Sequence, residues 1–299
     1  MCALGGTLGL CRTLMPRSAF KADIKRLSAA SATRGMQMVE SVATVSRGQR
    51  DRPDRSKFFA ISSTTMLLIV LIAFSRTFYF RPFIEATDLT AQLGQRALPW
   101  HVVIHGSVLT LWFMIFCCQT WLVASRRIYW HRRLGWYGIA VSVAVSVSAI
   151  STVLLFPARG LDGGFPLEAV TGIVVGDSLF QLLFICLVSL AVYWRHRAEV
   201  HRRLMYFAAI AIIGPAFSSG NQRPFGTLLE QVLPASLPFS NFLIGLWSAV
   251  FALLAFDFLS AKRMYVATMG PAILFTLAEV FAANSGTIGW GQRLVAWLA

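Results

Sequence analysis

A series of long apolar segments constrains this chain more than any other feature of its sequence. The hydrocarbon core of a bilayer is about 30 Å thick, and a helix needs roughly 20 apolar residues to cross it. We predict seven spans, the fifth short and containing Pro215: 59–78, 99–124, 135–156, 169–194, 203–219, 238–260 and 265–284. The sequence therefore predicts an all-α fold, a polytopic transmembrane helical bundle of about seven helices within residues 58–299.

Basic residues are concentrated in alternate connections between these segments. Four lie in RRIYWHRR (126–133), four in RHRAEVHRR (195–203) and two at Lys262 and Arg263, whereas the intervening connections hold one or two. Cytoplasmic loops of membrane proteins carry such an excess of Lys and Arg. The pattern predicts a cytoplasmic N-terminus and an external C-terminus. We therefore interpret the net charge of +14 as a consequence of the orientation in the membrane. The Arg clusters are expected to contact anionic lipid headgroups. We expect no nucleic acid partner.

The N-terminal segment, residues 1–57, has a different composition. It holds 11 of the 27 basic residues and is rich in Ser and Ala. We expect a basic, disordered cytoplasmic tail. Two alternatives stay open: residues 1–35, with Asp23 as their single acid, resemble an organellar targeting segment, or the start codon is set too far upstream and translation begins at Met36 or Met38.

The tetrad His-Arg-Arg-Leu occurs twice, at 131–134 and 201–204. Both copies fall at the predicted cytoplasmic start of an outward-running helix, where Arg side chains can extend to the lipid phosphates. An offset of 70 residues also aligns Gly106 with Gly176 and Ile115 with Ile185. We predict an internal repeat of two helix hairpins, with convergence on a basic helix start as the alternative.

Polar side chains inside the apolar segments are the candidate site, because a charge at mid-membrane costs roughly 3 kcal/mol. The predicted topology places most of them in the outer half, and Gln119 continues the helical face of His105 toward the cytoplasm. The set is Arg76, His101, His105, Gln119, Asp177, Gln181 and Glu279. If their faces converge, they line an outward-opening polar cavity. The structural alternative is interfacial or carbonyl-bonded side chains, and Asp257 is expected beside Lys262 or Arg263.

Histidine spacing suggests two kinds of centre. His101 and His105 are four residues apart on one helix, which presents two imidazoles to one metal, of unknown identity, with Asp177 or Glu279 as a further ligand. A b-type haem with two axial histidines needs them on different helices at one depth. His131 and His201 meet that requirement, although their Arg neighbours suit lipid phosphates as well as haem propionates.

Several motifs resemble those of a broad group of uncharacterised bacterial multipass membrane proteins. They are RTFYFRPF, HGSVLTLWFMIFCCQTWLVASRRIYWHRRLGW, GDSLFQLLF and HRRLM, between about residues 75 and 225. In this group, a His-Gly pair lies on one helix, which here is at His105, and a Gln precedes a basic loop, here Gln119. The next helix starts with His-Arg-x-Leu-Gly, here His131 with Gly135. A Gly-Asp pair on the following helix matches Asp177, and a His-x-Arg-Leu-Met helix start matches His201 with Met205. The resemblance implies a bacterial inner (plasma) membrane protein and no established activity.

Three functional hypotheses follow from these residues. The first is non-enzymatic: a polar small-molecule, ion or proton site in the outer half of the bundle. The second is a redox membrane module that binds b-type haem or quinone. The third is a membrane assembly factor without a ligand. The chain contains no nucleophile elbow, P-loop or dinucleotide fingerprint.

Overall fold

The computed structural model describes residues 55–81, 98–217, 224–225, 228, 231, 241–262 and 264–299. The chain divides after Pro53, and all the described residues belong to the second unit, Asp54–Ala299. The predicted tail, the targeting segment within it and the alternative start sites fall outside the described residues, except for the last three residues of the tail.

Every regular element among the described residues is a helix, which confirms the all-α prediction. The elements are α2 (Arg55–Ala73), the short π-helix η1 (Ser75–Tyr79), α4 (Trp100–Ala124), α5 (Ile128–Asp162), α6 (Leu167–Tyr193), α7 (Ala198–Ile213), the 3-10 helix η3 (Gly214–Phe217), α9 (Asn241–Ala261), α10 (Val266–Ser285) and α11 (Gly289–Leu298). Pro99 and Pro166 directly precede α4 and α6, where a missing backbone N–H costs the helix nothing.

Five of these helices are long and apolar enough to cross a membrane: α2, α4, α5, α6 and α10. Helix α9 also contains an apolar segment, Gly245–Ser260. Helix α7 has 16 residues and then tightens into η3. The described residues therefore support an integral membrane protein, while the count of seven spans and the internal repeat stay predictions.

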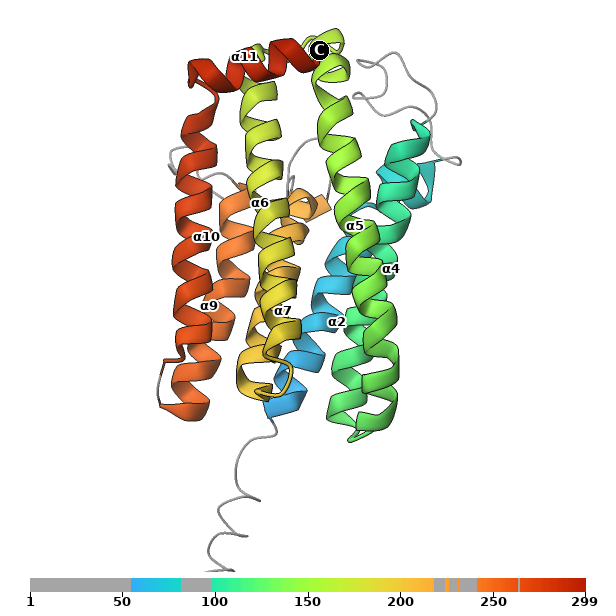
Figure 1. The fold of residues 1–299 in the computed structure, drawn as a ribbon, viewed down its shortest axis with the longest axis vertical. Coiled ribbons are helices and arrows are strands. Elements are labelled where there is room, and N and C mark those ends of the chain that lie inside the picture. Colours follow the sequence, from blue (N-terminus) through green and yellow to red (C-terminus); the bar gives the residue numbers. More distant parts are fainter. Residues whose placement is uncertain are drawn as a thin grey trace, which may run out of the picture. The chain divides into compact units, whose positions relative to one another are not determined.

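The long helices run side by side and their connections alternate between two ends (Figure 1). The short connections 125–127 and 194–197 lie at one end, which we call the basic end. The turn 163–166 and helix α11 lie at the other, which we call the α11 end. Helix α11 lies across its end and packs on α5 and α6, with Val295 buried and Trp297 exposed.

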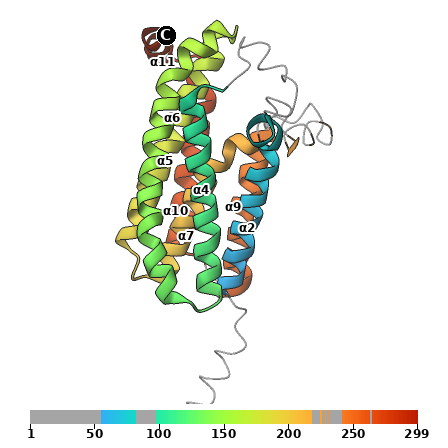
Figure 2. The ribbon, with the colours of Figure 1, turned by 90° about the vertical axis from the view of Figure 1, so that its right-hand side faces the viewer.

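Helix α7 is the most enclosed element of the bundle. It contacts α2, α6, α9 and α10, and most of its residues are buried, including Tyr206 and Phe207. Figure 2 shows α2 and α9 on one side and α5 on the other. Helix α5 contacts α4, α6 and α11 and exposes large apolar residues such as Val143, Val147 and Leu154. That apolar exposure suits contact with lipid.

Candidate functional site in the α4–α5 interface

His105 is held between α4 and α5. Its Nδ1 lies 3.1 Å from Oγ of Ser148. The single hydroxyl proton of Ser148 is donated to the carbonyl of Val145 at 3.0 Å, so its oxygen accepts from His105. This arrangement assigns the imidazole proton to Nδ1. Ser148 is therefore not an activated nucleophile, because the imidazole donates to the hydroxyl and does not accept from it.

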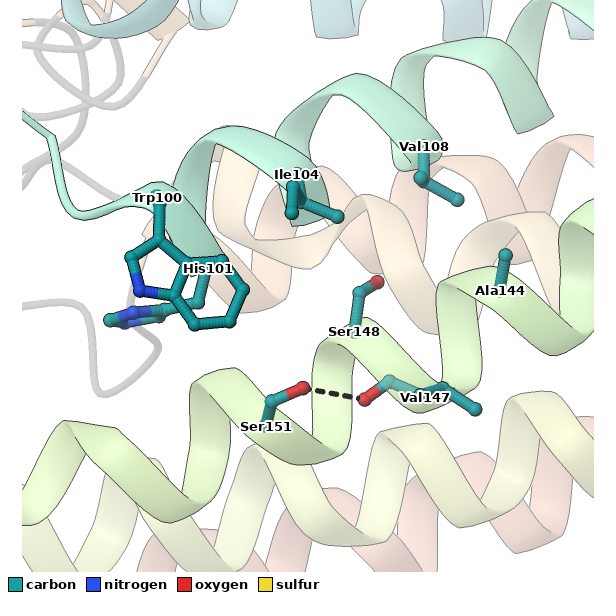
Figure 3. A pocket seen from close by; sticks show the side chains of 8 residues that line it. All are labelled: Trp100, His101, Ile104, Val108, Ala144, Val147, Ser148 and Ser151. Atoms are coloured by element: carbon teal, nitrogen blue, oxygen red, sulfur yellow. Dashed lines mark hydrogen bonds between the residues drawn. The ribbon is translucent and has the colours of Figure 1, made fainter.

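A groove of about 380 Å³ lies beside this contact, toward the α11 end. Four residues of α4 and four of α5 line it: Trp100, His101, Ile104, Val108, Ala144, Val147, Ser148 and Ser151 (Figure 3). Its wall is mainly apolar. The hydroxyl of Ser151 is already used, because its Oγ donates to the carbonyl of Val147 at 2.8 Å.

His101 and Trp100 stand together at one end of the groove (Figure 3). The two rings are nearly perpendicular, with centroids 5.9 Å apart. Nε2 of His101 is buried and has no hydrogen-bond partner among the described residues. Buried polar atoms are normally paired, so this nitrogen marks a place where a bound group can contribute a partner.

Arg159 lies near the same end, about two turns beyond Ser151 on α5. Its charge acts on the imidazole of His101. Its Nε is also buried without a partner among the described residues, and its guanidinium carbon lies 5.8 Å from the ring centroid of Phe156. Sequence reasoning treated Arg159 only as a lone charge in an external connection.

Glu279 lies in a different helix interface. It is buried on α10, and its Oε2 accepts a hydrogen bond from Nε1 of Trp247 on α9 at 2.8 Å. Helix α10 packs on α6, α7 and α9, whereas α4 packs on α2 and α5. His105 and Glu279, predicted to face one cavity, therefore have their contacts in two separate interfaces.

The remaining predicted residues are distributed over the bundle. Asp177 and Arg76 have exposed side chains, on α6 and η1. Gln181 is buried on α6, and its Nε2 has no partner among the described residues. Gln119 lies near the basic end, where its Nε2 is 3.8 Å from the position of a Cβ added at Gly135. Within the described ranges, no group of three or more His, Cys, Asp or Glu side chains has the arrangement of a metal site.

The haem-ligand candidates His131 and His201 do come together at the basic end. Their ring centroids are 6.4 Å apart, and the ring planes make an angle of 82°. Nδ1 of His201 donates to the carbonyl of Ala191 at 2.8 Å, because a carbonyl oxygen can only accept. The lone pair of His201 is therefore on Nε2. Nδ1 of His131 is buried and has no partner in the described part of the chain.

A buried ion pair at the basic end was not predicted from the sequence. Arg203 and Asp257 are both fully buried and form two hydrogen bonds, one of them Nε to Oδ2 at 2.9 Å. Thr268 donates to Oδ2 of Asp257 at 2.5 Å. The guanidinium of Arg203 stacks 3.7 Å from the ring centroid of Tyr265 and donates to Glu199 at 2.7 Å.

One expectation is corrected by this network. The tetrad arginine Arg203 does not extend to lipid, because α7 is enclosed by other helices and the acid it pairs with is on α9. Asp257 forms its ion pair with Arg203, and Arg263, expected near it, lies outside the described residues. One signal was available in the sequence, because Asp257 and Arg203 both lie near the basic ends of their predicted spans, 238–260 and 203–219.

Glu199 completes the network outside the predicted span 203–219. Burial raises the pKa of its carboxyl, but the hydrogen bonds and charges of Arg203 and Arg202 lower it by more. The pKa of Glu199 therefore lies below the ordinary range of glutamate.

Comparison with known proteins adds no family to this description. A scan against protein-family models and searches of curated proteins and of solved structures find no match for this chain.

Proposed function

We propose that this integral membrane protein binds an anionic amphiphile, a long apolar chain with a carboxylate or phosphate head, in the groove between α4 and α5. The observation that carries the proposal is the buried, unpartnered Nε2 of His101 at the end of an apolar groove, with the buried, unpartnered Nε of Arg159 on a side chain whose charge acts on that imidazole. The proposal specifies the small-molecule site in the predicted outer half of the bundle.

The charges at this end of the site favour an anionic head group on the ligand. Arg159 is a permanent cation, and the protonated or Nε2–H form of His101 is a second donor. Hydrogen bonds between a cation and an anionic oxygen are shorter and roughly twice as strong as neutral ones. An acidic head therefore suits this end better than a neutral quinone carbonyl does.

The apolar side chains that line the groove favour an apolar tail on the ligand. Ile104, Val108 and Val147 present apolar surface along it, and Trp100 is 72% exposed at its end. An acyl chain that moves from the bilayer into the groove exchanges one apolar environment for another, so the groove accommodates the tail and the charged head supplies the affinity. Because Ile104 and Val147 are also exposed on the lipid-facing side, a ligand can enter laterally from the bilayer.

The same geometry supports binding over catalysis. In the Ser148–His105 contact beside the groove, Ser148 donates its proton to the carbonyl of Val145. A nucleophilic serine needs the reverse arrangement, with the hydroxyl donating to the imidazole. We therefore propose a non-enzymatic role for this site.

The test is saturable binding of tritiated palmitate to protein in phosphatidylcholine nanodiscs. His101→Ala and Arg159→Gln each remove a hydrogen bond to the charged head. The loss is about 1.5–3 kcal/mol, on the order of a ten- to hundredfold fall in affinity. Ala144→Phe fills the groove and abolishes saturable binding. The control is His196→Ala, which removes an exposed histidine at the basic end and leaves the affinity unchanged.

A competition experiment distinguishes the two ligands that could carry the acidic head, a phospholipid and a free fatty acid. Phosphatidylglycerol that displaces palmitate identifies a phospholipid site, whereas displacement by other fatty acids alone identifies a free-acid site. If Ala144→Phe binds palmitate as the wild type does, the groove is not the site and the proposal fails.

A second candidate function is b-type haem binding, because His131 and His201 meet across two helices. Two imidazoles that ligate one metal from opposite sides, at about 2 Å each, have centroids roughly 6 Å apart. The observed separation is 6.4 Å. Nδ1 of His201 donates to the carbonyl of Ala191, which fixes the ring and leaves the lone pair of Nε2 for a metal. Metal-ligating histidines are commonly oriented by such a hydrogen bond from the other ring nitrogen.

A reduced-minus-oxidised visible spectrum of the detergent-purified, haem-supplemented protein tests this candidate. A haem site gives a sharp reduced band that is lost in both His131→Ala and His201→Ala and retained in His196→Ala. A flat spectrum in the supplemented wild type removes the candidate.

The basic end is the proposed cytoplasmic end. Six arginines there are exposed: Arg126, Arg127, Arg132, Arg133, Arg195 and Arg197. They suit anionic headgroups of a bacterial inner membrane. Labelling of single cysteines introduced at Ser125 and Thr287 by an impermeant maleimide on intact cells tests the orientation; labelling at Ser125 and not at Thr287 would reverse it.

A further inference from the structure

Glu279 is a buried carboxyl that the amphiphile groove does not use. It is 7% exposed and lies six residues before α10 ends at Ser285, which is roughly 9 Å along a helix. It is therefore nearer the α11 end than the basic end. A carboxyl so far inside a span is costly and is normally retained for a pairing or a function.

The carboxyl lies where three helices meet. Trp247 of α9 donates to Oε2. On α10, Phe275 and Ala282 are one turn before and nearly one turn after Glu279, and both contact α6. The ring of Phe275 is 5.2 Å from that of Phe180, and Ala282 is 3.5 Å from the position of a Cβ added at Gly176.

The hydrogen bonding of Glu279 suits the neutral acid. An ionised carboxylate can accept about four hydrogen bonds, yet Oε1 is buried and has no partner among the described residues. No described Lys, Arg or His forms an ion pair with Glu279. Burial with a single neutral donor and no counter-charge disfavours the ionised form.

The neighbouring helices supply little charge at this depth. On α6 the titratable groups are Glu168, Asp177, Cys186 and Tyr193, all of which are exposed. Helix α7 and η3 hold no titratable residue between Phe207 and Phe217. On α9 the acid is Asp257, which lies ten residues deeper than Trp247 and is paired with Arg203. No other residue of α10 is titratable.

We propose that Glu279 is a proton-binding site inside the membrane, occupied by a proton at neutral pH and served from the α11 end. Trp247 holds the carboxyl in place and leaves Oε1 to carry the proton. The site lies in the α6–α9–α10 junction and is independent of the α4–α5 groove, so its variants do not change palmitate binding.

Dicyclohexylcarbodiimide provides a direct test, because this apolar reagent reacts with protonated carboxyls within a bilayer. The acid transfers its proton to one reagent nitrogen, its oxygen bonds to the central carbon, and the acyl group then migrates to nitrogen. The product is a stable adduct with no leaving group. Mass spectrometry of the full chain in nanodiscs at pH 7 is expected to place one adduct on Glu279 and to show less adduct as the pH is raised.

Four variants make the assignment specific. Glu279→Gln, which still accepts from Trp247, loses the adduct. Asp177→Asn and Asp257→Asn retain it. Trp247→Phe removes a donor that favours the ionised form, so the extent of labelling at fixed pH rises. An unlabelled wild-type Glu279 at pH 7, or equal labelling in Glu279→Gln, overturns the proposal.

Discussion

The two His-Arg-Arg-Leu tetrads share four residues and have opposite surroundings. In α5, Arg132 and Arg133 are exposed at the basic end, and Arg133 lies 5.6 Å from the ring centroid of Tyr129. In α7, Arg203 is fully buried and paired with Asp257. The same motif is a surface anchor in one helix and a buried link between helices in the other.

The difference comes from the positions of the two helices. Helix α5 is at the edge of the bundle, whereas α7 has protein on most sides. The residue four positions before the second arginine differs accordingly: Tyr129 precedes Arg133, and Glu199 precedes Arg203. A repeated motif thus identifies two equivalent helix starts, but the neighbouring helices determine what each side chain contributes.

The largest expected effect separates Arg203 from Arg133. Arg203→Ala leaves the Asp257 carboxylate buried without its cation, and breaking a buried pair in this way costs about 3–5 kcal/mol. Arg133→Ala removes an exposed side chain and changes the free energy of unfolding by no more than about 0.5 kcal/mol. Equilibrium unfolding in mixed SDS–detergent micelles measures both, and equal losses would abolish the distinction between the tetrads.

Replacing both partners sharpens the comparison. A buried ion pair exchanged for apolar residues of similar volume is often neutral or stabilising, so Arg203→Met with Asp257→Leu regains most of the loss. Thr268 then lacks its acceptor, which costs about 1 kcal/mol. A double variant as unstable as the sum of the single variants would show that the two residues do not act as a pair.

The two tyrosines are expected to differ in the same direction. Cation–π contacts contribute roughly 0.5–1 kcal/mol at exposed sites and about 2 kcal/mol when desolvated. Tyr265→Leu, under buried Arg203, therefore destabilises by about 2 kcal/mol, and Tyr129→Leu, under exposed Arg133, by about 0.5 kcal/mol. The same unfolding assay ranks them; a reversed order contradicts the assignment of Arg203 to a desolvated site.

The smallest effect is the pH dependence contributed by Glu199, which precedes the second tetrad and has no acidic counterpart at Tyr129 before the first. Because the folded pKa of Glu199 lies below its unfolded value of about 4.3, its contribution is complete above that value and is lost as the pH falls through the folded pKa. The Glu199 side chain is 42% exposed, so solvent screening limits the effect to a few tenths of a kcal/mol. Glu199→Gln should remove this acid-side loss of stability, and an unchanged pH profile would contradict it.

Two helix positions were predicted closely, while α5 and α7 extend beyond their predicted spans, α5 at both ends. The predicted spans 99–124 and 169–194 agree with α4 and α6 within two residues. Helices α5 and α7 instead begin at Ile128 and Ala198, several residues before the predicted spans 135–156 and 203–219. Apolar runs mark the part of a helix within the hydrocarbon, whereas hydrogen bonding continues through the charged tetrads outside it.

The sequence proposes the polar residues of the candidate site but not how the packing of the helices groups them. His101 and His105 belong to the α4–α5 interface and Glu279 to the junction of α6, α9 and α10, because the direction of each helical face depends on which neighbour it packs against. Arg159 was missed as a neighbour of His101 because the two residues lie on different helices. The meeting of His131 and His201 was anticipated from their equal predicted depth.

The sequence by itself determined the helical segments and the asymmetry between a basic and a less basic end. Both are local properties, since a helix in lipid satisfies its own backbone hydrogen bonds and needs only a run of apolar residues. Tertiary structure alone decided which charges meet. Arg203 and Asp257 are 54 residues apart in sequence, and only the packing of α7 against α9 desolvates them together and makes each the other's partner.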